Sequence, residues 1–135
     1  MNASLSRVIL YVQDVAGLAD FYNSALGLPI VEQIEGEWAV LKAGGCELAL
    51  HRVGQRYRVA DPASWQVETN AKLVMTVDRA IEELRAELVA KGVPMGEIKS
   101  YPGLTGRLCD GKDPEGNVFQ LAESPRGRNG KLSSA

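Results

Sequence analysis

The chain has 135 residues and a formal net charge of −2, with 45% hydrophobic and 24% charged residues. This composition is typical of one globular domain, and it lacks the dominant basic face of a nucleic-acid-binding protein. No apolar run approaches the roughly 20 residues that cross a bilayer, and the first residues lack a signal-peptide layout. We therefore expect a soluble cytoplasmic protein with no nucleic-acid or membrane partner.

The first segment predicts a strand followed by a helix. Arg7–Val12 is rich in β-branched and aromatic residues, as strands are. Asp14 suits a helix N-cap, and Gly27 with Pro29 forms a stop signal. Between them, apolar residues recur at the spacing of an amphipathic helix: Leu18, Phe21, Tyr22, Ala25 and Leu26.

Three strand-like runs follow this helix, at Ile30–Ile34, Trp38–Leu41 and Glu47–Val53. Gly44 and Gly45 form a turn signal between the last two runs. The next segment, Gly54–Asn70, is polar with little periodicity, and we interpret it as a link. Its Trp65 either covers a cleft or makes a local hydrophobic contact.

The same pattern recurs 65 residues later, where Val77 corresponds to Val12 and Gly92 to Gly27. Lys72–Val77 predicts a strand, and Asp78 suits the N-cap of a second helix. The apolar stripe of that helix consists of Ile81, Leu84, Leu88 and Val89. Strand, helix and stop signal therefore form a repeated unit.

Three further strand runs complete the second copy, at Met95–Ser100, Gly106–Asp110 and Val118–Glu123. A strong turn signal, Asp113–Asn117, precedes the last run. The sequence thus predicts one α+β domain over residues 1–124. It consists of two βαβββ modules, at about 5–53 and 71–123, joined by a link at 54–70. We expect a flexible tail at 125–135.

Each predicted module leaves one face of its sheet without a helix. Two such modules side by side can form a curved mixed sheet that makes a cup, with the helices outside. The interior of a cup of this kind suits a small ligand. We therefore expect a small-molecule site on the inner faces of the two sheets.

Several segments together resemble one known family. Val8–Val15, Phe21-Tyr22 and Leu26–Leu28 are similar to the first-module pattern of the vicinal oxygen chelate superfamily. Asp113–Leu121 is similar to its closing strand motif, and the likeness spans about residues 5–123. The resemblance implies a glyoxalase/bleomycin resistance/dihydroxybiphenyl dioxygenase-like fold and a homodimer. The metal-dependent members are lyases, isomerases and dioxygenases that hold a divalent ion in the cup.

The resemblance also assigns positions to the metal ligands of those enzymes. In this chain the four positions hold Arg7, Ala49, Lys72 and Gln120. Arginine stays protonated and offers no lone pair, and alanine has no ligand atom. The two cations would also repel an ion, since unit charges 4 Å apart interact by roughly 4 kcal/mol at an effective dielectric near 20. We therefore expect no metal and no other cofactor.

Two alternatives remain open for Arg7 and Lys72. They either form a cationic floor for an anionic ligand, or sit at the strand starts, solvated or paired with carboxylates. Similar alternatives hold for the other candidates, which either line the pocket or serve in packing and solvation. The candidate ligand-binding residues are Arg7, Trp38, Ala49, Lys72, Tyr101, Arg107 and Gln120.

Catalytic signals in the sequence are weak. His51 is the only histidine, and with Glu47 it forms either a shifted site or a simple rim pair. Cys46 and Cys109 lack CxxC spacing and are read as reduced thiols. Two functional classes remain: a metal-free protein that binds or sequesters an anionic or aromatic small molecule, and a metal-dependent enzyme of the same superfamily. The missing ligands favour the binding protein.

Overall fold

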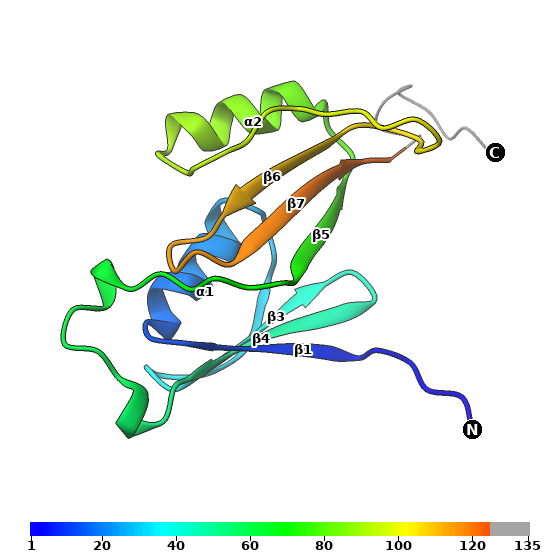
Figure 1. Ribbon diagram of the computed structural model, residues 1–135. Helices are drawn as coiled ribbons and strands as arrows, with labels where there is room; N and C mark the ends of the chain where they lie inside the picture. Colours follow the sequence, from blue (N-terminus) through cyan, green and yellow to red (C-terminus); the bar gives the residue numbers. More distant parts are fainter. Residues whose placement is uncertain (125–135) are drawn as a thin grey trace. The chain divides into compact units, whose positions relative to one another are not determined.

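The computed structural model describes residues 1–124. The chain forms two compact units, the first ending at Gln66 and the second beginning at Val67. Each unit contains one mixed sheet and one α-helix, and Figure 1 shows the order of the elements along the chain. The predicted α+β architecture of two repeated modules is confirmed.

The sheet of the first unit has the strand order β1-β4-β3-β2. Its strands are β1 (Arg7–Val12), β2 (Ile30–Ile34), β3 (Trp38–Ala43) and β4 (Cys46–Arg52). β1 pairs parallel to β4, and the other pairs are antiparallel. The predicted bounds of β1 and β2 are confirmed, and those of β3 and β4 differ by one or two residues.

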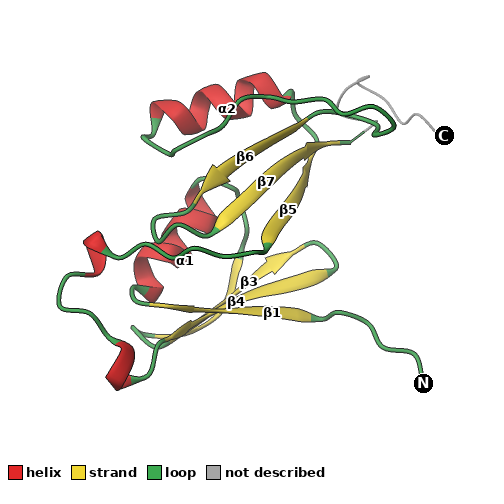
Figure 2. Cartoon of the chain, viewed as in Figure 1, coloured by secondary structure: helices red, strands yellow, loops and turns green. Residues whose placement is uncertain are grey.

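Helix α1 (Val15–Ser24) lies against one face of this sheet (Figure 2). Asp14 is its N-cap, as predicted, and accepts a hydrogen bond from the backbone of Gly17 at 3.0 Å. Leu18 and Tyr22 of the helix are fully buried. Gly27 has a φ of 73°, a left-handed conformation that ends the helix and strongly favours glycine.

The second unit repeats this plan with fewer strands, in the order β5-β7-β6. Its elements are β5 (Lys72–Val77), α2 (Ile81–Ala90), β6 (Leu108–Lys112) and β7 (Val118–Glu123). The bounds of β5 and β7 are those predicted, whereas β6 begins two residues later than expected. Gly92 again adopts a left-handed conformation, with a φ of 83°, at the same place in the repeat as Gly27.

Two predictions for the second unit are wrong. Asp78 does not cap α2, because the helix starts at Ile81 and its N-cap is Ala80, which has no capping side chain. The run Met95–Ser100 is not a continuous strand. It touches β6 through two isolated bridges, Met95 to Gly111 and Lys99 to Leu108. Between the two bridges, five residues of this segment (95–99) lie opposite four residues of β6 (108–111), so a regular ladder cannot form.

The core of each unit lies between its helix and its sheet. In the second unit, Phe119, Leu121 and Cys109 face the buried side of α2, from which Ile81 and Leu88 project. Burial raises the pKa of the Cys109 thiol, and both cysteines are free. The inert thiol and the closely packed neighbours indicate a structural role for this face.

The link contains two short 3-10 helices, Gln55–Tyr57 and Pro62–Ser64. The side-chain amide of Gln13 fixes its first part, donating to the carbonyl of Tyr57 at 2.9 Å and accepting from the amide of Val59 at 3.1 Å. Within residues 1–124, neither α-helix has the length and apolar character that a bilayer crossing requires. The tail predicted at 125–135 lies outside the described residues.

Candidate functional site

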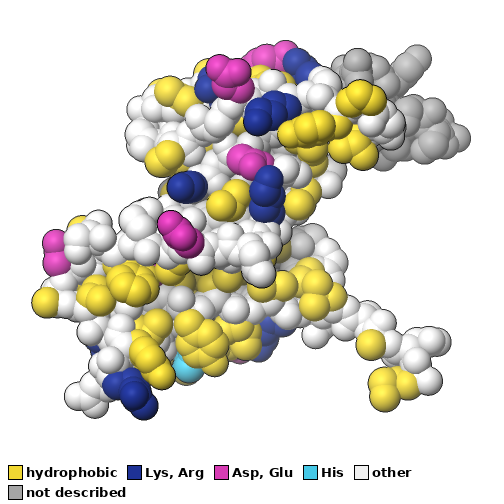
Figure 3. Space-filling model, in the orientation of Figure 1, with side chains coloured by type: hydrophobic (Ala, Val, Ile, Leu, Met, Phe, Trp, Pro, Cys, Tyr) yellow, Lys and Arg dark blue, Asp and Glu magenta, His cyan; other side chains and the backbone are white. Residues whose placement is uncertain are grey.

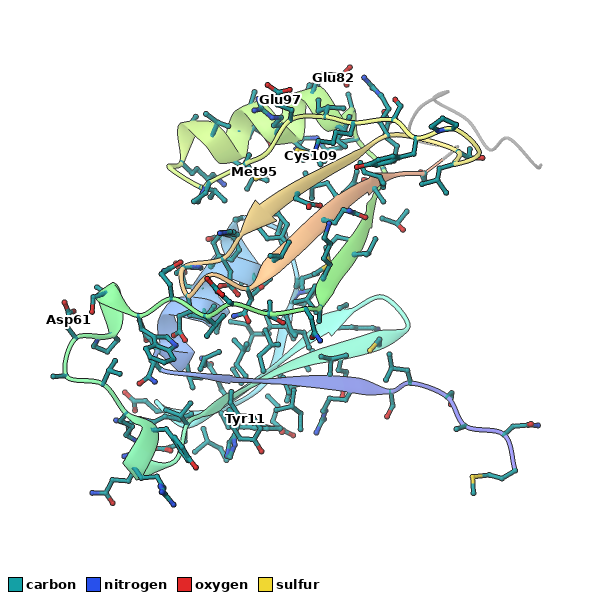
Figure 4. All side chains as sticks on the ribbon, in the orientation of Figure 1. Tyr11, Asp61, Glu82, Met95, Glu97 and Cys109 are labelled. Carbon is teal, nitrogen blue, oxygen red and sulfur yellow. The ribbon has the colours of Figure 1, made fainter. Side chains whose placement is uncertain are left out.

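The face of each sheet opposite its helix, here called the open face, carries five of the seven predicted site residues: Arg7, Trp38, Ala49, Lys72 and Gln120. In the first unit, strand pairing aligns Arg7 with Glu47, Ile9 with Ala49, and Tyr11 with His51. Because side chains alternate along strands, these residues share one face. Figure 4 shows Tyr11 on the side of β1 away from α1.

Arg7 lies in a charged contact at the start of β1. Its guanidinium donates to the carboxylate of Glu47 from Nε at 3.1 Å and from Nη2 at 2.8 Å. The same guanidinium lies over the ring of Trp38, 5.4 Å from its centroid. Arg7 therefore faces the open side, but its charge is already balanced by a carboxylate.

Three aromatic rings meet on this open face. His51 contacts Tyr11 with ring centroids 5.1 Å apart and Trp38 at 5.7 Å, both edge to face. The Trp38 indole N–H donates to Glu32. Tyr11 keeps 63% of its surface exposed, so the cluster is accessible to solvent. We call Tyr11, Trp38 and His51 the aromatic cluster; Figure 3 shows hydrophobic side chains around the histidine on this unit.

Ala49 lies deeper on the same face. It is fully buried, as is Val40, its partner across the strand pair. Ala49 therefore forms part of the floor beneath the larger side chains. Its small size leaves room for them without offering a polar contact.

In the second unit, the open face carries a chain of polar contacts. Lys72 on β5 donates from Nζ to Oδ2 of Asp110 on β6 at 2.7 Å. Gln120 on β7, the strand between them, donates from Nε2 to the other oxygen of Asp110 at 2.9 Å. One carboxylate thus fixes both predicted site residues of this sheet.

These contacts determine the charge states of the pair. The hydrogen bond to Asp110 raises the pKa of Lys72 above that of a free lysine. Burial raises the pKa of Asp110, but the hydrogen bonds from Lys72 and Gln120 and the charges of Lys72 and Lys99 outweigh it, so the pKa is lowered. At neutral pH Lys72 is therefore an ammonium and Asp110 a carboxylate.

A pocket of about 200 Å³ opens beside this pair. Tyr101, a predicted site residue, contributes to its wall and keeps 49% of its surface exposed. Lys99, from the segment bridged to β6, lines it as well. The residues lining the pocket are Lys72, Gly96, Glu97, Lys99, Tyr101, Leu108, Asp110 and Gln120.

Arg107 lies apart from this pocket. Its guanidinium joins Glu82 of α2, at 2.8 and 3.0 Å, to Glu123 at the end of β7, at 3.0 and 2.7 Å. The hydrogen bonds to Glu123 and Glu82 raise the pKa of Arg107, which remains charged at every ordinary pH. The structure thus gives Arg107 a role in tying the helix to the sheet.

The residues present do not fit a divalent ion. Of the four positions that correspond to metal ligands, Arg7 and Lys72 are cations held in ion pairs, and Ala49 has no donor atom. Gln120 offers one amide oxygen. Over residues 1–124, no three side chains of His, Cys, Asp and Glu gather closely enough to hold a metal ion. Glu47 binds Arg7 rather than joining His51 in a shifted site.

Five residues of the pocket had not been predicted, and Asp110 and Lys99 are the two that matter most for its charge. Asp110 stood at the end of an expected strand, and only the register that pairs it with Gln120 reveals its place. Lys99 belongs to the segment whose strand prediction failed, so its facing could not be obtained from alternation. The sequence does show charged residues on the predicted strands of this unit, but it does not show which of these strands pair or in which register.

Solved structures share this fold over nearly the whole chain. A lactoylglutathione lyase from Agrobacterium tumefaciens is 19% identical, with 91% of this chain and 95% of the other covered and a TM-score of 0.70. The antibiotic binding protein TnmS3 from Streptomyces sp. CB03234 is 23% identical (90% and 96% covered, TM-score 0.66). The fosfomycin resistance protein FosX from Listeria monocytogenes is 17% identical (95% and 99%, TM-score 0.71).

These identities are low, so the likeness establishes the fold alone. No curated protein matches the chain in sequence. A family model does, over residues 4–121, and both copies of the repeat lie within that range. The chain belongs to the Glyoxalase/Bleomycin resistance protein/Dioxygenase superfamily.

Proposed function

We propose that this protein binds a small organic molecule on the open faces of its sheets, without a metal ion. The observation that carries the proposal is the chemistry of the four positions discussed above. Arg7 and Lys72 are held by Glu47 and Asp110, so neither the cations nor their carboxylates are free to accommodate an ion. A lyase, isomerase or dioxygenase that needs a bound ion has no suitable donor set here.

The aromatic cluster supports a planar aromatic ligand. Trp38 and Tyr11 present rings on a face that solvent reaches, and stacking on such rings contributes beyond the area buried. The Arg7–Glu47 ion pair beside these rings is neutral overall and adds no net charge to this face. The antibiotic binding protein with the same fold is a precedent for small-molecule binding on this framework.

Tryptophan fluorescence tests the proposal directly. The chain has two tryptophans, and replacing Trp65 by Phe leaves Trp38 as the reporter. We expect a planar aromatic probe, 2-naphthamide, to change the Trp38 emission saturably in protein treated with EDTA. A binding isotherm without saturation, or none at all, would count against the proposal.

A matched variant sharpens this test. Trp38→Ala is expected to weaken binding about tenfold, in the range that aromatic contacts contribute. Tyr57→Ala is the control, because Tyr57 is also exposed and also lies under an arginine, Arg56, at 5.3 Å, but outside the sheet. Titration calorimetry measures both. The homodimer implied by the resemblance stays a prediction, which light scattering checks.

A further inference from the structure

We infer that the pocket of the second unit binds a carboxylate group, with Lys72 and Lys99 as its cationic partners. The inference rests on the proposed function, because it specifies the charge of the small molecule. It is carried by three features of the pocket: two lysines beside Asp110, N–H groups of Lys72 that Asp110 does not use, and a small wall of apolar and aromatic surface.

Two lysines lie near Asp110 in this pocket. Lys72 forms a salt bridge to it at 2.7 Å, and Lys99 acts on the same carboxylate from the pocket wall. Among residues 1–124, Lys99 has no carboxylate of its own within salt-bridge distance. Glu97 also lines the pocket but, within residues 1–124, forms no ion pair with either lysine. The pocket therefore holds two lysines and two carboxylates, of which Lys72 and Asp110 are paired and Lys99 is not.

The ammonium of Lys72 is held in place with hydrogen-bonding capacity left over. It carries three N–H groups, and Asp110 accepts from one of them at 2.7 Å. Gln120 fixes the other oxygen of Asp110, so the carboxylate cannot rotate freely. The remaining N–H groups of Lys72 suit an oxygen acceptor. A carboxylate provides two oxygens, one for each lysine.

The residue that makes this site unsuitable for a metal ion makes it suitable for an anion. At a position where metal-dependent relatives carry a metal ligand, this chain has a lysine, whose own positive charge can bind an anionic group without a metal ion. A fixed cation facing a pocket attracts an anionic oxygen. Lys72 would be a binding residue, and Asp110 and Gln120 would be positioning residues that act through it.

The size and wall of the pocket limit the rest of the ligand. The space is about 200 Å³, and Tyr101 and Leu108 supply aromatic and apolar surface. Tyr101 lies near enough to act on the charge of Lys72. A small planar acid fits this combination, with its carboxylate at the lysines and its ring against Tyr101.

Two matched probes separate charge from shape. Titration calorimetry at neutral pH compares 2-naphthoate with 2-naphthamide, which has the same ring system and no charge. We expect the unmodified protein to bind naphthoate about tenfold more tightly, the usual contribution of a hydrogen bond to a charged group. Lys72→Met and Lys99→Met should each remove most of this preference and leave naphthamide affinity unchanged.

Lys91→Met is the control, because Lys91 is an exposed lysine at the end of α2 and does not line the pocket. Circular dichroism verifies that each variant is folded. Equal affinity for the two probes, or a preference that survives both lysine substitutions, overturns the inference and leaves the proposed function standing. Failure of both probes to bind overturns the proposed function, and the inference with it.

Discussion

The open faces of the two units start from the same plan and differ in their chemistry. Arg7 and Lys72 both occupy the first position of the first strand in their unit. Arg7 pairs with Glu47 on the adjacent strand, and its guanidinium lies over the ring of Trp38. Lys72 instead reaches across β7 to Asp110 on β6, with Gln120 between them.

This difference shows how a repeated backbone can acquire two kinds of surface. The repeat preserves the backbone positions of equivalent residues, whereas the residues on neighbouring strands determine the contacts of their side chains. In the first unit the cation lies over the ring of Trp38, and in the second it borders a polar pocket. The open faces of the two units therefore suit different ligand groups, an aromatic ring in the first unit and an anionic group in the second.

The largest expected difference between the units is in the loss of stability when an ion pair is broken, and it concerns the contacts of Arg107 with Glu82 and Glu123. Glu123 is nearly buried and accepts from the backbone and the guanidinium of Arg107. Glu123→Ala should lower the free energy of unfolding by about 2–3 kcal/mol, because it leaves these donors without a partner. Glu37, which pairs with Arg52 at the surface of the first unit, is the control. Glu37→Ala should cost less than about 0.5 kcal/mol in chemical denaturation.

A second comparison concerns close packing. An added Cβ at Gly111 would overlap the side chains of Phe119 and Met95, which pair with Gly111 from β7 and from the bridged segment. Gly111→Ala should destabilise the protein by about 2 kcal/mol, as overpacking does. At Gly45, in the first unit, the same methyl group meets nothing within 4 Å. Equal shifts of the melting temperature for Gly111→Ala and Gly45→Ala would contradict the close packing described around β6.

Acid is expected to act on the second unit through two carboxyl groups. The hydrogen bond from Arg107 lowers the pKa of Glu123 despite burial, and contacts with Lys72 and Gln120 outweigh burial at Asp110. Their stabilisation is complete above the unfolded pKa of about 4 and is lost as the pH falls through the lowered folded values. Denaturation at pH 7, 4.5 and 3 measures the decline. Glu123→Gln should reduce its slope; an unchanged slope would contradict this assignment.

Removal of metal ions is expected to have no effect on stability or binding. Treatment with EDTA, followed by dialysis, should leave the melting temperature and the binding of 2-naphthamide unchanged. Addition of Zn²⁺ or Mn²⁺ should not restore or increase either quantity, since the donor set does not fit an ion. A metal-dependent gain in binding or stability would remove the basis of the proposed function.

Much of the fold was accessible from sequence because its signals are local. The 65-residue offset, the Asp14 cap and the exact bounds of β1 and β5 follow from residue periodicity and turn chemistry. The start of α2 was misjudged since Asp78 looks like a cap, although two further residues precede the helix. Met95–Ser100 failed for a tertiary reason, because its pairing with β6 is irregular.

The candidate site was less predictable. Arg7, Lys72 and Gln120 were obtained from the resemblance, but their partners depend on strand order and register, which span distant parts of the chain. Arg107 was a candidate ligand-binding residue with a solvated charge as the alternative, and its contacts with Glu82 and Glu123 appear only when α2 is placed against β7. Local patterns identified positions, while long-range pairing determined their electrostatics.

The irregular edge beside β6 has a consequence for how this protein could change. Neither bridge involves Glu97 or Ile98, so these residues lie outside the ladder that holds the sheet together. Substitutions or insertions there would remodel the rim near Lys99 at little cost to folding. In evolutionary terms, the weakest-paired stretch of the repeat is the one best suited to shifting ligand preference.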